Sequence, residues 1–408
     1  MTTVLGEYLS FSLPFLDLSI ELGLRFFGHA HGYDVSATLR DPYWQREYIK
    51  YNHADGVITM SQASQERLIA LGLDRSKVFV IPYGVVVPCI RPIHVPRLEV
   101  RCVAVGRMVA KKGPILTLDA FRRAAAMCPQ LQLDYVGDGP LLSAARQFIR
   151  AFDLEGRVTL HRAQPPDVVQ TLMRNADIFI QHSLTDSETG DEEGLPVAVL
   201  EAMANALPVV STFHAGIPEA VENGTTGYLG AEGDSEAMGG YLVELTRNVE
   251  LRASMGEAGW LRARELFSIE RERKDLLDVL GLENEKSRHT ARIRQEPNRA
   301  VRSLPQRRPI GRGHSQSGNP RSHSRVVYNG VDPRTFDIKR SAASSAIRAE
   351  FNIPASAKVG AIVGNIVPHK GQLVLVEAIC RVVRTAPDLV FLITSRCNQM
   401  WWARGNDR

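Results

Sequence analysis

The sequence is poor in cysteine and has no pattern that would use its cysteines together. The five cysteines lie far apart, their number is odd, and none forms a Cys-x-x-Cys pair. We therefore expect neither a disulfide framework nor a zinc ribbon, and a reducing, cytoplasmic compartment fits this usage best. The cysteines are Cys89, Cys102, Cys128, Cys380 and Cys397.

A long uninterrupted apolar run is also absent. The most apolar stretch, Leu9–Phe27, contains Pro14 and is interrupted by Asp17, Glu21 and Arg25. A membrane-spanning helix needs about 20 nearly uninterrupted apolar residues, and a signal peptide needs a basic segment before its apolar part. The stretch instead predicts a buried helix within a folded domain.

A strong overall charge is also missing, since the net charge is only +4. The basic residues are nevertheless concentrated in one segment, Lys286–Arg325, which holds eleven of them against one acid, Glu296. This segment is rich in Ser, Gly, Pro and Gln, which predicts a disordered linker. Such an arm is able to bind RNA or an anionic membrane surface. No aromatic residues interleave with the arginines to stack on bases. We expect a solvated linker and no nucleic-acid partner, and peripheral membrane association stays open.

What the chain does contain, from about Val100 to Leu282, is an alternation of short apolar runs and amphipathic segments. Such an alternation predicts a parallel sheet covered on both faces by helices. The expected strands are Arg101–Val105, Leu131–Val136, Val158–His161, Ile178–Gln181 and Pro208–Ser211. The expected helices are Ile115–Met127, Leu141–Phe152, Asp167–Arg174, Pro196–Asn205, Ser235–Arg247 and Leu251–Leu280, and the last two segments suggest helices only.

The first 90 residues predict part of another α/β unit. Val57–Met60 and Val78–Pro82 are expected strands, with a helix at Gln62–Leu71 between them. No complete set of strands and helices precedes them, so this lobe is expected to be truncated at its start.

An internal repeat appears after the basic segment. Six residues of the first copy recur with the same offset of 258 residues and no gap, and the second copy then stops after two strands and one helix. The expected organisation is a partial lobe at 1–90, a complete domain at 91–282, a linker at 283–325, a truncated second copy at 326–394 and an unstructured tail at 395–408. The repeated residues are Gly106, Lys112, Gly113, Ala120, Pro129 and Leu131, matched by Gly364, Lys370, Gly371, Ala378, Pro387 and Leu389.

The strongest chemical motif is Glu193-Gly194-Leu195-Pro196, which continues as a helix to a second carboxylate, Glu201. Proline suits the first turn of a helix, where its missing N–H costs nothing. The free N–H groups of a helix start form a natural phosphate site, and the flanking carboxylates can accept hydrogen bonds from sugar hydroxyls. A solvated helix would explain Glu201 alone but not the whole string.

Two weaker motifs accompany it. Gly106-Arg107-(x)4-Lys112-Gly113 follows a strand directly, so two cations leave its carboxyl end, where open α/β sheets bind ligands. His31-Gly32-Tyr33-Asp34 follows the strand-like Phe26–Ala30. A basic loop or a single histidine is by itself commonplace.

Together these strings resemble the family 4 retaining glycosyltransferases of the GT-B type, over roughly residues 26 to 282. Ile-Pro-Tyr-Gly-Val at 81–85, Val-Gly-Asp-Gly-Pro at 136–140 and Ser-Thr-Phe-His-Ala-Gly-Ile-Pro-Glu at 211–219 also match. The last string and the loop 183–194 look most like members of the colanic-acid, exopolysaccharide-building type. The fold that this resemblance implies is α/β, with Rossmann-like parallel sheets in a partial N-terminal lobe and a complete donor-binding lobe.

The resemblance also implies roles for single residues. Arg107 and Lys112 would hold the donor diphosphate, and Gly194 and Leu195 would offer it backbone N–H groups. Glu193 would contact donor-sugar hydroxyls and act in catalysis together with His31, which would lie near the reacting sugar carbon. Glu201 would contact the nucleotide ribose, and 161–163 would border the base.

The function implied is transfer of a hexose from a UDP- or GDP-hexose to a saccharide or lipid-linked acceptor, with retention. No Asp-x-Asp pair occurs in the chain, so we expect no metal ion and no cofactor. Two departures from the family pattern weigh against turnover. The family's first βα units, which include a glycine-rich loop facing the acceptor, have no counterpart before Phe26. In the second copy, Asn365 stands at the position that Arg107 occupies in the first. A non-catalytic nucleotide-sugar-binding or interaction fragment is therefore the alternative.

Overall fold

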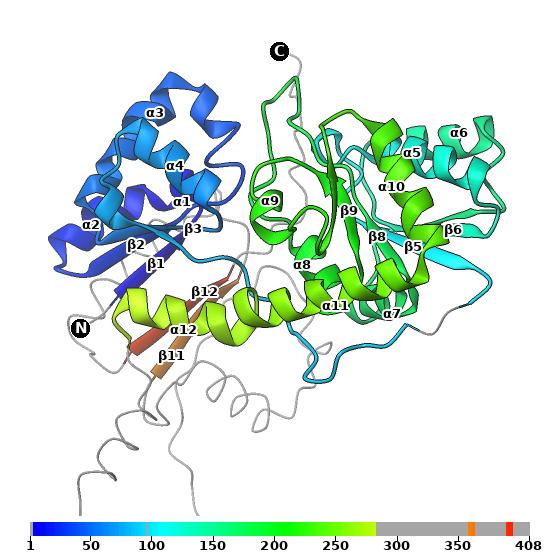
Figure 1. The fold of residues 1–408 in the computed structure, drawn as a ribbon. Coiled ribbons are helices and arrows are strands. Elements are labelled where there is room, and N and C mark those ends of the chain that lie inside the picture. The colour runs from blue at the N-terminus through cyan, green and yellow to red at the C-terminus, as the bar shows by residue number, and fades with distance from the viewer. Residues whose placement is uncertain (1–2, 95–96, 283–357, 364–388, 395–408) are drawn as a thin grey trace, which may run out of the picture. The chain divides into compact units, whose positions relative to one another are not determined.

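The structure is a computed structural model that describes residues 3–94 and 97–282 and two strands, 358–363 and 389–394. The chain divides into two compact units, Met1–Pro297 and Asn298–Arg408. Within the first unit, Figure 1 shows an N-terminal lobe (residues 3–90, blue) and a second lobe (residues 97–267, cyan to green), each built on a parallel sheet with helices packed around it. The expected linker at 283–325 and tail at 395–408 lie outside the described residues.

Four parallel strands form the sheet of the N-terminal lobe, in the order β1-β2-β3-β4. Its helices are connected by short 3₁₀ turns, and its core is rich in aromatic and branched side chains from β2, β3 and the helices. The strands are β1 Thr3–Glu7, β2 Arg25–His29, β3 Gly56–Thr59 and β4 Val78–Val80. The helices are α1 Leu9–Ser12, α2 Pro14–Glu21, α3 Pro42–Tyr48 and α4 Gln62–Leu71.

The start of this lobe corrects one expectation. A strand and two helices, β1, α1 and α2, precede Phe26, where the sequence analysis expected no βα unit. The stretch expected as one helix divides at Pro14 into α1 and α2 and ends in β2. Strand β1 escaped notice because it is only five residues long, is half-buried and contains a glycine, which weakens the period-2 pattern.

Six parallel strands form the sheet of the second lobe, in the order β10-β9-β8-β5-β6-β7. Since β5 lies between β8 and β6, the strand order reverses between β5 and β8, which makes this place the switch point of the sheet. Sheets of this kind bind their ligands at the switch point, just outside the carboxyl ends of the strands. The strands are β5 Val100–Val105, β6 Leu131–Val136, β7 Val158–His161, β8 Ile178–Ile180, β9 Val209–Thr212 and β10 Gly227–Gly230. The helices are α5 Pro114–Met127, α6 Leu142–Ala151, α7 Pro166–Asn175, α8 Val197–Ala204, α9 Ile217–Ala220, α10 Ser235–Arg247 and α11 Val249–Leu266.

The predicted strands and helices of the second lobe are confirmed within one or two residues, with three corrections, the first of which is that the short helix α9 was not predicted. Strand β10 was missed, because its four residues begin and end with glycine and suggest a turn. The segment expected as one helix from Leu251 to Leu280 is two helices, α11 and α12 (Ile269–Leu280), separated at Ser268, whose side chain accepts a hydrogen bond from the Arg271 N–H.

Helix α12 returns from the second lobe to pack on the N-terminal lobe. Leu280 is buried in a small core with Phe27, Ile58 and Ile81. The Arg25 guanidinium donates from Nη1 to the Leu280 carbonyl oxygen at 2.7 Å. The last helix therefore completes the core of the first lobe.

In the second unit, β11 Lys358–Val363 pairs in parallel with β12 Leu389–Thr394. Lys358 faces Leu389 and Val363 faces Thr394. In the first unit Val100 faces Leu131 and Val105 faces Val136. Every partner in the second pair stands 258 residues after its equivalent, so the two strand pairs have the same length, direction and register.

Candidate functional site

The site lies at the switch point of the second lobe's sheet. The loop after β5 carries Arg107 and then a short 3₁₀ turn, Ala110–Lys112, closed by Gly113 in a left-handed conformation. The loop after β8 runs to α8 and carries Glu193 just before that helix. Because β5 and β8 are neighbours and parallel, the two loops meet at the same edge of the sheet. Helix α8 begins at Val197, one position later than expected, with Pro196 as its N-cap.

The Glu193 carboxylate lies between two lysines of the facing loop. Lys112 Nζ is 3.0 Å from Glu193 Oε2, and Lys111 Nζ is 3.6 Å from Glu193 Oε1. The Glu193 side chain is 12% exposed. Burial by itself raises the pKa of Glu193, but the charges of Lys112, Lys111 and Arg107 outweigh it and lower that pKa. A carboxylate and three cations thus form a mixed-charge cluster at the switch point.

Lys111 was not among the predicted residues. Its ammonium also contacts Asp191 Oδ1 at 2.9 Å and the Glu192 carbonyl oxygen at 3.0 Å. Lys111 therefore fastens the two loops together, while Lys112 pairs with the carboxylate alone. Adjacent lysines are equivalent in the sequence, so only the resemblance singled out Lys112.

Gly194 and Leu195 lie where the two lobes meet. A Cβ atom on Gly194 would stand 2.7 Å from Met60 Sδ, and one on Gly32 would stand 2.6 Å from the Gly194 backbone nitrogen. Glycine is required at both positions because the lobes approach each other this closely. Leu195 is buried in the core of the second lobe. The predicted contacts of these two N–H groups with a diphosphate stay predictions.

Glu201 is the fifth residue of α8, just over one turn from the start of that helix. Its Oε1 accepts a hydrogen bond from Gln170 Nε2 on α7 at 3.2 Å. Burial raises the pKa of Glu201, and the Gln170 hydrogen bond offsets this only in part. The structure gives no contact between Glu201 and Glu193, so its predicted ribose contact stays a prediction.

His31 follows β2 in the N-terminal lobe, and both of its ring nitrogens have partners. Nε2 lies 2.7 Å from Glu7 Oε2, and Nδ1 lies 2.7 Å from the Tyr83 hydroxyl oxygen. Tyr8 stacks on the ring with the centroids 4.0 Å apart. The residue after His31, Gly32, contacts the residue after Glu193, so closure of the lobes brings the two predicted catalytic residues to the same interlobe region.

Glu7 was missed because it stands before the segment that carries the resemblance. The parallel register pairs Glu7 with His29, and His31 follows two residues later on the same side. The side-chain ligand atoms of Glu7, His29 and His31 lie within 4.8 Å of one another, and in the part of the chain that the structure describes this is the one group able to hold a metal ion. Glu7 contacts His29 Nδ1 at 3.3 Å and His31 Nε2 at 2.7 Å, whereas the buried His29 Nε2 has no hydrogen-bond partner, and the expectation of no metal stays a prediction.

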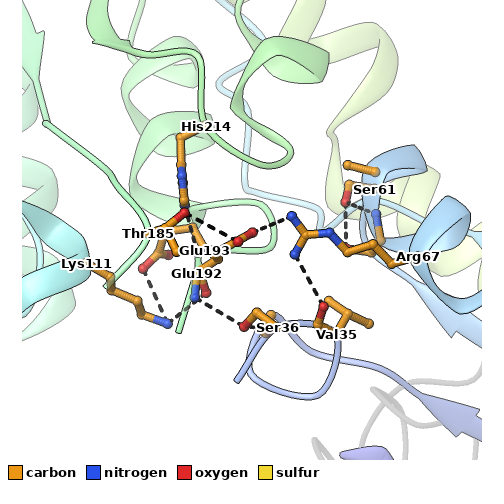
Figure 2. A network of polar contacts seen from close by, with 12 residues as sticks. Val35, Ser36, Ser61, Arg67, Lys111, Thr185, Glu192, Glu193 and His214 are labelled. Atoms are coloured by element: carbon orange, nitrogen blue, oxygen red, sulfur yellow. Dashed lines mark hydrogen bonds and ion pairs between the residues drawn. The ribbon is translucent and has the colours of Figure 1, made fainter. Parts of the chain in front are cut away.

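Figure 2 shows the polar network that joins the two lobes. Glu192 pairs with Arg67 of α4 at 2.5 Å, and its backbone N–H donates to Ser36 Oγ at 3.1 Å. Beside this network lies a cavity of about 520 Å³, lined from the N-terminal lobe by Arg40 and Arg67 and from the second lobe by Thr185 and Glu192. The loop 185–193 therefore contacts the lysines of the loop after β5 on one side and the N-terminal lobe on the other.

The chain folds into two Rossmann-like lobes, and a basic loop and a carboxylate lie at the switch point of the second lobe's sheet. This is the architecture of the GT-B glycosyltransferases. Residues 97–262 match the family model "Glycosyl transferases group 1", and residues 6–87 match "Glycosyltransferase Family 4". Residues 97–262 thus carry the similarity to the group 1 glycosyltransferases, and residues 6–87 carry the similarity to family 4.

Two curated relatives come from exopolysaccharide synthesis. The putative colanic acid biosynthesis glycosyltransferase WcaL of Salmonella typhimurium is 32% identical over 220 residues, which cover 53% of this chain and 54% of that protein. The amylovoran biosynthesis glycosyltransferase AmsK of Erwinia amylovora is 32% identical over 234 residues, or 56% and 54%. The chain thus spans about half the length of these relatives.

Solved structures agree in fold. Anabaena HepE in complex with UDP is similar with a TM-score of 0.60 at 20% identity, covering 69% of this chain and 78% of that one. Staphylococcus aureus TarM in a complex that includes UDP gives a TM-score of 0.54 at 19% identity, covering 63% and 51%. Among the described residues, no helix is long and apolar enough to cross a membrane.

Proposed function

We propose that this protein transfers a hexose from a nucleotide-diphosphate sugar, with UDP or GDP as the nucleotide, to a saccharide or lipid-linked acceptor, with retention and without a metal ion. The observation that carries the proposal is the buried Glu193 carboxylate between Lys111 and Lys112 at the switch point of the sheet. The likeness to exopolysaccharide glycosyltransferases and to structures solved with UDP supports it. The cytoplasm is the proposed compartment, with peripheral membrane contact where the acceptor is lipid-linked.

The proposed chemistry uses this chain's own charges. Arg107 and Lys112 bind the diphosphate and stabilise the charge that develops on it as the sugar leaves, with help from the N–H groups at the start of α8. Glu193 then exchanges its contact with Lys112 for hydrogen bonds to donor-sugar hydroxyls. Glu201 holds the ribose, and the side chain of His31 lies near the reacting carbon.

The first experiment is calorimetric titration of the chain with UDP and with GDP, beside Arg107→Ala and Glu201→Ala. Loss of one charge-assisted contact weakens binding by about tenfold or more. Two control variants should bind like the wild type: Arg123→Ala, which breaks an exposed ion pair with Asp119 on α5, and Lys370→Ala, the equivalent of Lys112 in the sequence repeat. A folded wild-type chain that binds neither nucleotide would overturn the donor site.

The alternative function, a non-catalytic nucleotide-sugar-binding or interaction fragment, predicts the same nucleotide binding. Incubation with UDP-glucose and other UDP- and GDP-hexoses, with and without saccharide acceptors, separates the two. Sugar transfer supports the enzyme. Binding without transfer to any acceptor favours the alternative.

We also propose that the second unit repeats the start of the donor lobe. The matching register of β11–β12 and β5–β6 and the constant offset of 258 residues support this. Because Asn365 stands where the first copy has Arg107, this copy lacks one of the two cations proposed to bind the diphosphate, and we expect it to bind no donor. The Lys370→Ala control tests this directly.

A further inference from the structure

The loop 185–193, which carries Glu193, is held at one end by the Glu232 carboxylate and at the other by His214, which the same carboxylate contacts. Glu232 Oε2 accepts a hydrogen bond from the Thr185 N–H at 2.9 Å. Its other oxygen, Oε1, lies 2.6 Å from His214 Nδ1. His214 Nε2 in turn accepts a hydrogen bond from the Glu193 N–H at 3.1 Å. Figure 2 shows His214 pointing from its own loop towards Glu193, with Thr185 beside them.

The hydrogen bonds fix the state of the His214 ring. Because Nε2 accepts from a backbone N–H, it carries no proton, and the proton must lie on Nδ1, from which it is donated to Glu232. The His214 side chain is only 1% exposed, so water cannot replace either partner. Burial raises the pKa of Glu232, but the hydrogen bonds from His214 and from the Thr185 N–H lower it further than burial raises it, so Glu232 is an anion.

A second hydrogen bond from the same turn holds the next residue. The Gly216 N–H donates to the Gly194 carbonyl oxygen at 2.9 Å. Ala215, between His214 and Gly216, has a φ of 44°, a left-handed conformation that an alanine adopts only at a cost. Such strain persists where the surrounding structure determines the backbone, and it gathers at functional sites.

We propose that His214 and Glu232 are a positioning pair that fixes the backbone of Glu193 and Gly194 in the geometry that binds the donor. The effect of this pair on donor binding rests on the proposed function. The fixing of the loop 185–193 by His214 and Glu232 does not. The pair touches no substrate in this account. It acts by satisfying the Glu193 N–H and by fastening Thr185, so that the loop cannot move away from Lys112 and α8.

The test compares His214→Leu, His214→Gln and Glu232→Gln with the wild type. Leucine removes both hydrogen bonds and leaves the Glu193 N–H buried without a partner, which should weaken UDP binding by about tenfold or more. Glutamine keeps an acceptor oxygen for the Glu193 N–H and a donor for Glu232, so it should recover most of the affinity. His94→Leu is the matched control, because His94 bonds only the carbonyl oxygen of Asn205.

Two measurements are made on each variant: the Kd for UDP by calorimetry, and hydrogen–deuterium exchange of the ligand-free chain. Faster exchange confined to 185–194 in His214→Leu and Glu232→Gln, with weaker UDP binding and rescue by His214→Gln, is the expected result. Unchanged exchange in that loop, or faster exchange throughout the second lobe as for a merely destabilised fold, would overturn the pair. Binding of UDP by His214→Leu with the wild-type affinity would overturn it as well. If the wild type binds neither UDP nor GDP, the proposed function fails, while the exchange data still decide whether His214 and Glu232 hold the loop 185–193.

Discussion

The Nε2 atom of His31 lies 2.7 Å from Oε2 of Glu7, a residue 24 positions earlier in the chain. The parallel pairing of β1 with β2 produces this contact, because it sets Glu7 beside His29 and so beside the residue two positions on. Tyr83 holds the other ring nitrogen. The His31 ring is thus oriented by neighbours in its own lobe, and Glu7 is the anion that orients it.

The Glu7 carboxylate should make the stability of the protein depend on pH. Burial raises its pKa, but hydrogen bonds with His29 and His31 lower it further, to about 2 from 4.5. A depressed pKa in the folded state means stability that is complete above about pH 4.5 and is lost as the pH falls towards 2. Since the Glu7 side chain is 46% exposed, solvent screening reduces the effect to about 1 kcal/mol.

Urea unfolding between pH 6 and pH 3 checks this. Glu7→Gln should have the shallower dependence on pH, and it should be destabilised relative to the wild type at pH 6 more than at pH 3. Glu66→Gln, which breaks an exposed ion pair with Arg75 in the same lobe, serves as the control and should keep the wild-type slope. Equal slopes for Glu7→Gln and the wild type would refute the assignment.

The parts of the site that the sequence predicts are those whose residues are contiguous. Glu193 to Leu195 stand in one string, and Arg107 and Lys112 in another, each directly after a recognisable strand. The parts that it does not predict depend on tertiary register. Glu7 reaches His31 only because β1 pairs with β2, and His214 reaches Glu193 only because β9 lies beside β8.

The same distinction holds for the fold. Strands that alternate apolar and polar residues, such as β6 and β7, and helices with a clear period, such as α4 and α10, are predicted to the residue. Strand β10 and the break between α11 and α12 are not predicted, since two glycines hide the first and neither glycine nor proline marks the second. Local pattern identifies an element when it is long enough, whereas short elements are fixed by their neighbours.

The pair Lys112 and Glu193 should show strong coupling in stability. Lys112→Met leaves a buried carboxylate with one of its nearest cations removed, which should cost about 2 kcal/mol at neutral pH. Glu193→Gln in the same chain removes the charge that needed compensation, so the double variant should be more stable than Lys112→Met alone. A double-mutant cycle by urea unfolding measures this coupling, and additive effects of the two changes would show that the charges do not interact.

Glu219 should control closure of the lobes. This residue of α9 accepts hydrogen bonds from the backbone N–H groups of Gln62 at 2.7 Å and Ala63 at 2.9 Å, at the start of α4 in the N-terminal lobe. A carboxylate at a helix N-terminus contributes about 1 kcal/mol, so Glu219→Ala should favour separated lobes. We expect faster hydrogen–deuterium exchange at amides 62 and 63 and a larger radius of gyration in solution scattering.

A second capping acid provides the comparison. Asp234 accepts from the Ala237 N–H at the start of α10, within the second lobe. Asp234→Ala should therefore speed exchange at the start of α10 without changing the radius of gyration. If Glu219→Ala left the scattering profile and amides 62 and 63 unchanged, Glu219 would have no part in closure.

Leu280 should stabilise the N-terminal lobe although it stands about 200 residues after it, because the last turn of α12 supplies part of that lobe's core. Leu280→Ala removes a side chain buried against Phe27, Ile58 and Ile81, and such truncations cost about 2–5 kcal/mol. Leu261→Ala, on the neighbouring helix but 45% exposed, should cost well under 1 kcal/mol. Chemical unfolding gives both values, and exchange at β2 and β3 locates the loss. Since α12 continues the chain of the second lobe and packs on the first, Leu280→Ala should speed exchange in β2 and β3 before it affects β5 and β6. A uniform loss across both sheets would mean that the lobes unfold as one unit and that α12 is not a separate support of the first.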